Sequence, residues 1–255
     1  MPKVLICLFT CLLIFQIQAK DVLKGHDIAT KAYNIEDGSD LSCKVEMEIS
    51  KGGGRVVKHR TLEFFRIDDG INNRGIFRIC SPKLLKGTTF LSWNNAGKDN
   101  DLWIYLPSKK KSRRVAGNNK YQKFVSSDFT YDDLSKWSLT RNIFKRLADD
   151  KGMYVIESVP KEKSEKIARK VVWVDKVNFV IMKVDYYNKS GKLVKTLTVE
   201  ELKKINGIWT VLKSRMKNFK SNSETILEVK NVVYDSGLSK GMFVSNKLNK
   251  RCRVK

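Results

Sequence analysis

The chain has 255 residues, of which 50 are Lys or Arg and 27 are Asp or Glu, and its formal net charge is +23. Hydrophobic residues make up 42% of it and there are only 4 Pro, so the composition excludes an intrinsically disordered, collagen-like or linker-like chain. The excess of positive charge indicates an anionic partner. Nucleic acid, an anionic membrane surface and an acidic protein or polymer are the classes that it leaves open.

Residues 1–19 have the pattern of a secretory signal peptide. Lys3 precedes an apolar stretch over residues 4–17, and Ala19 supplies a small residue at the cleavage point. The stretch is shorter than the roughly 20 residues of a membrane-spanning helix. We therefore expect cleavage after Ala19, export, and one folded domain over residues 20–255. An uncleaved N-terminal anchor is the alternative.

Three cysteines follow the predicted cleavage point: Cys43, Cys80 and Cys252. In an oxidising compartment an odd number allows at most one disulfide and leaves one thiol over. A bridge between Cys43 and Cys80 is one option. The alternating pattern around Cys43 favours a buried core thiol instead, and the spacing matches no zinc or redox motif.

The first elements of the exported chain are a helix and a hairpin. Residues 21–35 place apolar side chains at three- and four-residue intervals, which predicts a short amphipathic helix. Residues 41–50 then alternate between apolar and polar, so that they form a strand with one apolar face. Residues 52–54 are all Gly and predict a turn into a second strand over residues 55–68.

The same alternation continues to the end of the chain and predicts an antiparallel, meandering sheet. The clearest turns are residues 188–191 and 205–207, where Asn and Gly accept the positive φ of tight hairpins. Residues 131–137 and 238–248 are the other helical candidates. Further strands are predicted at residues 75–80, 88–94, 101–106, 112–116, 141–148, 153–158, 168–175, 179–188, 192–204, 208–218 and 224–234.

A sheet of this size cannot lie flat, because strand twist makes it curl. We predict a mainly β fold with a few short helices, in which a strongly curved antiparallel sheet of about 11 strands has an apolar concave face and a Lys-rich convex face. Short helices cover the concave face. Periodicity leaves open whether that face is a filled core or a ligand cavity.

The sequence offers little for catalysis. His26 falls in the predicted helix and His59 on a strand, and neither has the spacing of a metal site or a catalytic triad. The acidic pairs at residues 68–69, 132–133 and 149–150 fall where Asp caps backbone amides or begins turns. We predict no enzyme, no metal and no cofactor. An enzyme that uses the cavity of this fold to orient a small substrate is the weakest of three hypotheses.

The densest charge cluster is the run of residues 109–114, Lys-Lys-Lys-Ser-Arg-Arg. Such a run can bind phosphates, but export separates the protein from most nucleic acid, and no recognition helix accompanies the run. We therefore predict no nucleic-acid partner. Attraction to anionic lipid headgroups or envelope polymers is the better interpretation.

Residues 80–134 carry a specific pattern. Leu-Trp-Ile-Tyr-Leu-Pro at residues 102–107 is followed by Arg113-Arg114-Val115 and by Phe-Val-Ser-Ser-Asp-Phe-Thr-Tyr-Asp-Asp-Leu at residues 124–134. This order resembles the bacterial outer-membrane lipoprotein-sorting family of the LolA/LolB-like superfamily. The detailed match covers about fifty-five residues, and element order extends it over nearly the whole exported chain. Ser126 departs from the pattern, where Gly is expected.

The resemblance implies a periplasmic protein with a half-open antiparallel β-barrel of about 11 strands that binds the acyl chains of lipids or lipoproteins in its concavity. It also implies an inner-membrane transporter or an outer-membrane acceptor as protein partner. The alternative function is a non-catalytic, envelope-associated sensory or binding module for an anionic polymer, a membrane surface or a partner protein.

The aromatic side chains of this block are the candidate ligand contacts, with core packing as the alternative role for each. Trp103 and Tyr105 have the same parity on their strand and share one face. Arg113 and Arg114 are candidate contacts to lipid headgroups or to the membrane. The predicted apolar cavity is lined by Phe90, Trp93, Trp103, Tyr105, Phe124, Phe129 and Tyr131.

Overall fold

The computed structural model describes residues 23–52, 55–70, 72–95, 98–162 and 166–252. The predicted signal peptide at residues 1–19 and two of the three Gly residues at 52–54 lie outside these ranges. Within them the protein is mainly β, with one α-helix, α1 (Gly25–Tyr33).

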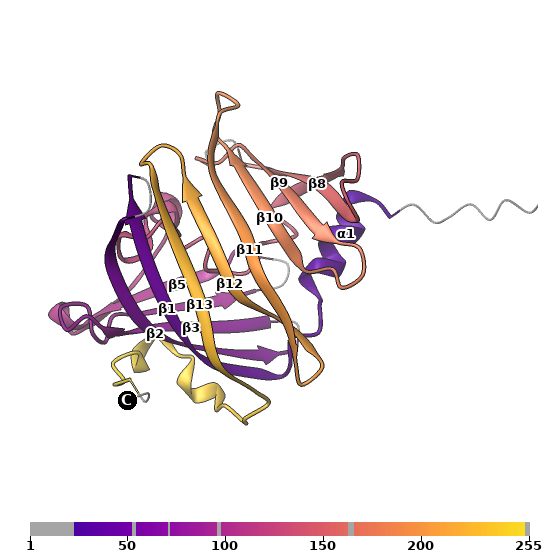
Figure 1. The fold of residues 1–255 in the computed structure, drawn as a ribbon. Coiled ribbons are helices and arrows are strands. Elements are labelled where there is room, and N and C mark those ends of the chain that lie inside the picture. Colours follow the sequence, from indigo (N-terminus) through magenta and orange to yellow (C-terminus); the bar gives the residue numbers. More distant parts are fainter. Residues whose placement is uncertain (1–22, 53–54, 71, 96–97, 163–165, 253–255) are drawn as a thin grey trace, which may run out of the picture.

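The strands follow the alternating segments of the sequence closely (Figure 1). They number thirteen in the described ranges rather than the about eleven expected for the sheet, and each of them matches one of the segments that the alternation predicts. The strands are β1 (Asp40–Lys51), β2 (Arg55–Asp69), β3 (Asn72–Ser81), β4 (Thr89–Asn94), β5 (Asp101–Leu106), β6 (Lys111–Arg114), β7 (Asn142–Arg146), β8 (Met153–Pro160), β9 (Arg169–Asp175), β10 (Ile181–Tyr187), β11 (Leu193–Ile205), β12 (Ile208–Asn218) and β13 (Ser223–Tyr234).

All strands belong to one antiparallel sheet, in the order β6-β5-β4-β3-β2-β1-β13-β12-β11-β10-β9-β8-β7. Two meanders, β1 to β6 and β7 to β13, are joined where β1 pairs with β13, with Leu41 opposite Tyr234 and Lys51 opposite Ser223. The edge strands β6 and β7 are consecutive in the chain. The segment that connects them must therefore cross the width of the open sheet. The predicted curved, half-open sheet is confirmed.

Helix α1 packs against the β7–β8 edge of the sheet, where Ile28 and Ala29 are fully buried. Gly25 allows the close approach, since a Cβ atom there would lie 2.6 Å from the backbone nitrogen of Arg146. The two other helix predictions are wrong as α-helices. Residues 131–137 form turns, and residues 238–248 contain two 3₁₀ helices, Lys240–Met242 and Ser245–Lys247.

The two faces of the sheet are both covered. We call the face that meets α1 and residues 115–139 the inner face, and the opposite one the outer face. On the inner face, the cluster over β1 to β5 contains Met47, Leu62 and Phe90, and the cluster over β8 to β12 contains Val172 and Met216. The side chain of Leu134 packs against both.

A third cluster lies on the outer face, between the sheet and the C-terminal segment. Phe65, Ile76 and Leu91 contribute from the strands, and Phe243 and Leu248 contribute from the segment. Along β4 and β5 neighbouring residues alternate between the two faces, as the pleat of a strand requires. None of the described helices has the length and apolar character needed to cross a membrane.

Candidate functional site

The inner face is closed by residues 115–139, which we call the inner cover. Apart from an isolated bridge between Lys123 and Thr130, it is built of turns and short 3₁₀ helices. Phe124 is fully buried, and its ring centroid lies 6.0 Å from that of Phe90 and 5.8 Å from that of Tyr131. The cover therefore fills the inner face with aromatic side chains that it supplies itself.

Asp128 fixes the middle of the inner cover to β13. Its carboxylate accepts hydrogen bonds from the Ser223 Oγ at 2.7 Å and the Thr225 Oγ1 at 2.9 Å, and its backbone N–H donates to that same Thr225 oxygen. The Lys123 ammonium lies 2.9 Å from the carboxylate. Asp128 is 2% exposed, so these contacts satisfy a carboxylate that would otherwise be buried without a partner.

A second attachment joins the inner cover to β11. The buried carboxylate of Asp133 pairs with the Lys195 ammonium and also accepts from the Thr130 N–H and hydroxyl, each at 2.7 Å. Burial alone would raise the pKa of Asp133, but the charges of Lys195 and Lys170 and the hydrogen bonds from Lys195 and Thr130 together outweigh it, and the pKa lies below its usual range. Burial, and then the Asp133 charge, hold the pKa of the neighbouring Tyr186 hydroxyl well above its usual range.

The position where the family pattern expects Gly has the backbone geometry that favours Gly. Ser126 has φ +66° and the preceding Val125 has φ +42°. Both lie in the left-handed region, which costs a residue with a side chain roughly 1–2 kcal/mol. The turn directly before Asp128 therefore contains two residues in a backbone conformation that favours Gly.

A cleft of about 310 Å³ lies between the inner cover and strands β9 to β12. We call it the inner cleft. Ile167, Tyr186 and Val194 form its apolar wall, and Lys166 and Lys220 stand at its exposed border. Asp128 and Asp133 line it on the cover side. The inner cleft is thus an opening to the inner face whose border is cationic.

The outer face is covered by residues 236–252, which we call the outer strap. Trp93 and Trp103 pack here with ring centroids 4.9 Å apart, and the Trp93 indole N–H donates to the Phe243 carbonyl at 2.7 Å. Tyr105 packs against the same cluster. These aromatic residues therefore contact the outer strap and do not reach the inner face.

The outer strap is attached at both ends. At its far end, Cys252 forms a disulfide with Cys80 of β3. At its beginning, the Asp40 carboxylate accepts from the backbone N–H groups of Ser236, Gly237 and Leu238 at 2.8–3.0 Å. Burial would raise the pKa of Asp40, but these hydrogen bonds bring it below its usual range.

The structure shows which two of the three cysteines form the disulfide. One bridge forms, and it excludes the Cys43–Cys80 option. Cys43 is a free, buried thiol on the inner face, as the alternation predicted. Burial raises its pKa to about 12, so it is not a reactive thiolate.

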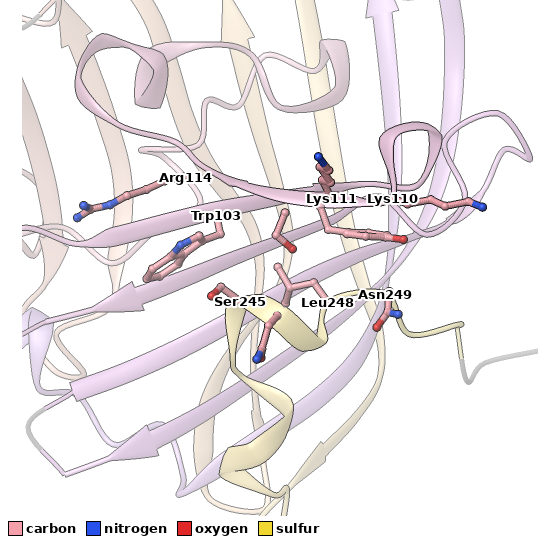
Figure 2. Close-up of a pocket in the computed structure, with 10 residues that line it drawn as sticks. Trp103, Lys110, Lys111, Arg114, Ser245, Leu248 and Asn249 are labelled. Atoms are coloured by element: carbon pink, nitrogen blue, oxygen red, sulfur yellow. The ribbon is translucent and has the colours of Figure 1, made fainter.

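A groove of about 500 Å³ runs between β5, β6 and the outer strap (Figure 2). Trp103 and Leu248 both line it, and Arg114 and Lys110 are directed to opposite sides. Arg114 forms an ion pair with Asp101. Arg113 lies opposite Ile104 in the register, and thus on the inner side of β6. The basic run therefore spreads its charge around the edge strand.

The remaining candidates for chemistry have structural partners. His26 contacts the Phe144 ring edge-on, and the His59 ring lies 3.2 Å from the Glu46 carboxylate. Among the described residues, Glu63, Cys80 and Cys252 lie close enough together to hold a metal ion. Both sulfur atoms belong to the disulfide, and Glu63 is paired with Arg78, so these donors are not free for a metal.

The predicted cavity residues are divided between the two faces. Phe90, Phe124 and Tyr131 lie together in one inner-face cluster and Phe129 in the other, whereas Trp93, Trp103 and Tyr105 lie on the outer face. Sequence reasoning missed the polar attachments of the inner cover. The signal was present, because Asp128 and Asp133 stand within the motif that resembles the lipoprotein-sorting family.

Comparisons with known proteins agree with this fold. A family model described as an uncharacterized protein matches residues 72–250. No curated protein matches the sequence. A DUF1329 family protein from Desulfovibrio piger is 28% identical with a TM-score of 0.80, over 88% of this chain and 97% of that one.

Two further solved structures share the same architecture. A candidate outer-membrane lipoprotein-sorting protein domain from Vibrio parahaemolyticus is 27% identical with a TM-score of 0.82, over 89% of this chain and 98% of that one. A LolA superfamily protein from Nitrosomonas europaea is 20% identical with a TM-score of 0.67, over 88% and 98%. The resemblance inferred from residues 80–134 is confirmed.

Proposed function

We propose that this protein is a periplasmic carrier of acyl chains. The chain belongs to the family of uncharacterized proteins whose model matches residues 72–250, and the chain has the LolA fold. The acyl chains of a lipid or lipoprotein bind on the inner face, and the inner cover moves aside to admit them. The relative named for outer-membrane lipoprotein sorting supports this cargo.

One observation carries the proposal. The apolar inner face of a large sheet is closed by a segment held mainly through side chains, the inner cover, and not by another layer of paired strands. A closing segment of this kind can leave without breaking the sheet. Phe124, Phe129 and Tyr131 then occupy, in the closed protein, the space that an acyl chain occupies in the loaded one.

The energetics of transport require such a shelter. An exposed methylene costs about 0.8 kcal/mol in water, so a chain of about 14 methylenes costs on the order of 10 kcal/mol. A carrier also has to release its cargo. Competition between the aromatic side chains of the inner cover and the acyl chain lowers the net affinity, because binding includes the cost of displacing the cover.

Delivery needs a donor and a recipient for the cargo. An inner-membrane transporter and an outer-membrane acceptor are the partners that this function requires. The inner cleft, with Lys166 and Lys220 at its border, is the route by which an acyl chain with an anionic headgroup enters.

The proposal is tested by titrating the purified protein with a fluorescent fatty acid and by native mass spectrometry of protein from a bacterial host. Asp128→Asn weakens the attachment of the inner cover. It therefore raises the population of the open form, and we expect about 10-fold tighter acyl binding than in the wild type. Asp99→Asn, at an acidic side chain that is 70% exposed, is the matched control.

A second pair of variants assigns the binding to one face. Phe124→Ala removes a buried ring that competes with the acyl chain on the inner face, so it should tighten acyl binding by about 10-fold. Trp103→Ala, on the outer face, should change it less than about twofold. Folded wild-type and Asp128→Asn proteins that both take up no lipid would overturn the proposal.

A further inference from the structure

The turns at one end of the sheet carry an unusual concentration of positive charge. Antiparallel strands place alternate turns at the same end, so segments far apart in sequence meet there. Gly52 N–H donates to the Asn222 carbonyl, Gly87 lies against Pro107, and the disulfide brings the end of the outer strap to β3. The turns between β1 and β2, β10 and β11, and β12 and β13 lie at the top of Figure 1.

We call the exposed cations of these turns the basic rim. Glu162 is the one acidic residue among the described residues of these turns. The structure gives none of the rim cations an ion-pair partner within its described ranges. The basic rim consists of Lys51, Arg55, Lys83, Lys86, Lys109, Lys110, Lys111, Lys161, Lys166, Lys189, Lys192, Lys220, Lys250 and Arg251.

The opposite end of the sheet has the reverse character. Its charges are largely neutralised within the protein: Asp37 pairs with Arg66, and Asp149 pairs with Arg146 and Lys176. A depression of about 690 Å³ there is lined by three acidic side chains, Glu36, Asp37 and Asp68, and by Lys136. The net charge of +23 is therefore not spread evenly, and the molecule is strongly polarised along its strands.

The inner cleft opens at the basic end. Its border residues Lys166 and Lys220 belong to the basic rim, and Asn188 and Asn218 of the adjacent turns line it as well. Exposed apolar side chains accompany the cations, with Val56 at 49% and Phe219 at 43% exposure. Unpaired lysines around apolar side chains complement a surface of anionic headgroups over acyl chains.

We propose that the basic rim is a docking surface for anionic phospholipid membranes, which places the mouth of the inner cleft against the bilayer. Docking of this kind is electrostatic and reversible, and it weakens as salt screens the charges. The identity of the cleft as a cargo route rests on the proposed function. The docking itself does not, because it depends on the rim alone.

Co-sedimentation with vesicles tests the docking. The full exported chain should bind vesicles that contain phosphatidylglycerol, bind phosphatidylcholine vesicles at least about 100-fold more weakly, and lose binding as salt is raised. The triple variant Lys109→Glu, Lys110→Glu and Lys111→Glu should lower the partition constant by at least about 100-fold, at roughly fivefold for each cation lost.

The matched control reverses three exposed lysines at the opposite end, in the variant Lys98→Glu, Lys151→Glu and Lys203→Glu. It changes the net charge equally and should leave vesicle binding within about threefold of the wild type. Equal losses in the two triple variants would overturn the proposal, since net charge and not the rim would then explain binding. Wild-type protein that binds polyphosphate but not the anionic vesicles would overturn it in favour of a soluble polymer.

A fluorescent fatty acid separates this proposal from the carrier function. The rim variant should still take up the probe from solution, because the inner face is unchanged. Intact probe uptake without vesicle binding by the wild type would contradict the docking surface alone. Vesicle binding without probe uptake would contradict the carrier function alone.

Discussion

The two faces of the sheet are covered by irregular segments that are attached in different ways. The inner cover is held by buried carboxylates, with Asp128 bound to Ser223 and Thr225 and Asp133 bound to Lys195. The outer strap is held by a disulfide at one end. The difference shows that one cover can leave the sheet through changes in side-chain contacts, whereas the other is covalently retained.

The Asp133 ion pair of the inner cover and the disulfide of the outer strap also respond to different conditions. The pKa of Asp133 is below its usual range in the folded protein, so the contribution of this carboxylate to stability is complete above about pH 4 and is lost as the pH falls through the lower, folded pKa. Reduction acts on the disulfide of the outer strap and on no contact of the inner cover. Variants of each attachment should therefore loosen one face and leave the other closed.

Lys195→Ala should have the largest effect, because it leaves the buried carboxylate of Asp133 without its cation. We expect a loss of about 3–5 kcal/mol in the free energy of unfolding, measured by urea denaturation. Hydrogen exchange should accelerate across residues 117–135. Lys203→Ala, at an exposed ion pair on the same strand, should cost less than about 1 kcal/mol. A loss below about 1 kcal/mol for Lys195→Ala would show that the Asp133–Lys195 ion pair does not hold the inner cover on the sheet.

Cys252→Ser should have the next largest effect. The disulfide closes a loop with a sequence separation of 172 residues, and its loss should lower the free energy of unfolding by about 2–5 kcal/mol. Wild-type protein in reductant should match the variant. Hydrogen exchange should accelerate in residues 236–251, while the inner cover keeps its protection. Equal loosening of both segments would show that the two covers are coupled.

The fold could be predicted in detail from the sequence because alternation is a local signal. Each range with an apolar face on every second residue, from residues 41–50 to 224–234, contains most of a strand. The helix predicted at residues 131–137 failed for a tertiary reason. The Asp133 carboxylate accepts a hydrogen bond from the Thr130 N–H and pairs with Lys195 of β11. These contacts stabilise turns rather than a helix.

The candidate site was less predictable, since parity gives the face of a residue but not what covers that face. Phe90 and Trp93 are three residues apart on one strand, so parity alone separates them, and the structure places them in different clusters. The cover of each face comes from distant segments. The Phe243 carbonyl accepts a hydrogen bond from the Trp93 indole although the two residues are 150 positions apart in the sequence. A local sequence pattern cannot predict such a contact.

Asp40→Asn should have the smallest effect and should act on the outer strap alone. The carboxylate accepts three backbone N–H groups and the Ser236 hydroxyl, and the amide oxygen of Asn cannot replace both carboxylate oxygens. We expect a loss of about 1–2 kcal/mol in the free energy of unfolding at pH 7.

The pH dependence of that loss identifies its cause. Because the folded pKa of Asp40 is lowered, the stability that its charge contributes is present above about pH 4 and disappears as the pH falls through the folded pKa. Denaturation curves of the wild type and of Asp40→Asn should therefore converge below pH 4, with Asp99→Asn as the exposed control. A difference that stayed constant with pH would mean that the Asn side chain perturbs packing, and that the start of the outer strap does not depend on the charge. The outer strap would then be held by its disulfide and by the burial of Phe243. Buried carboxylates would then hold the inner cover alone.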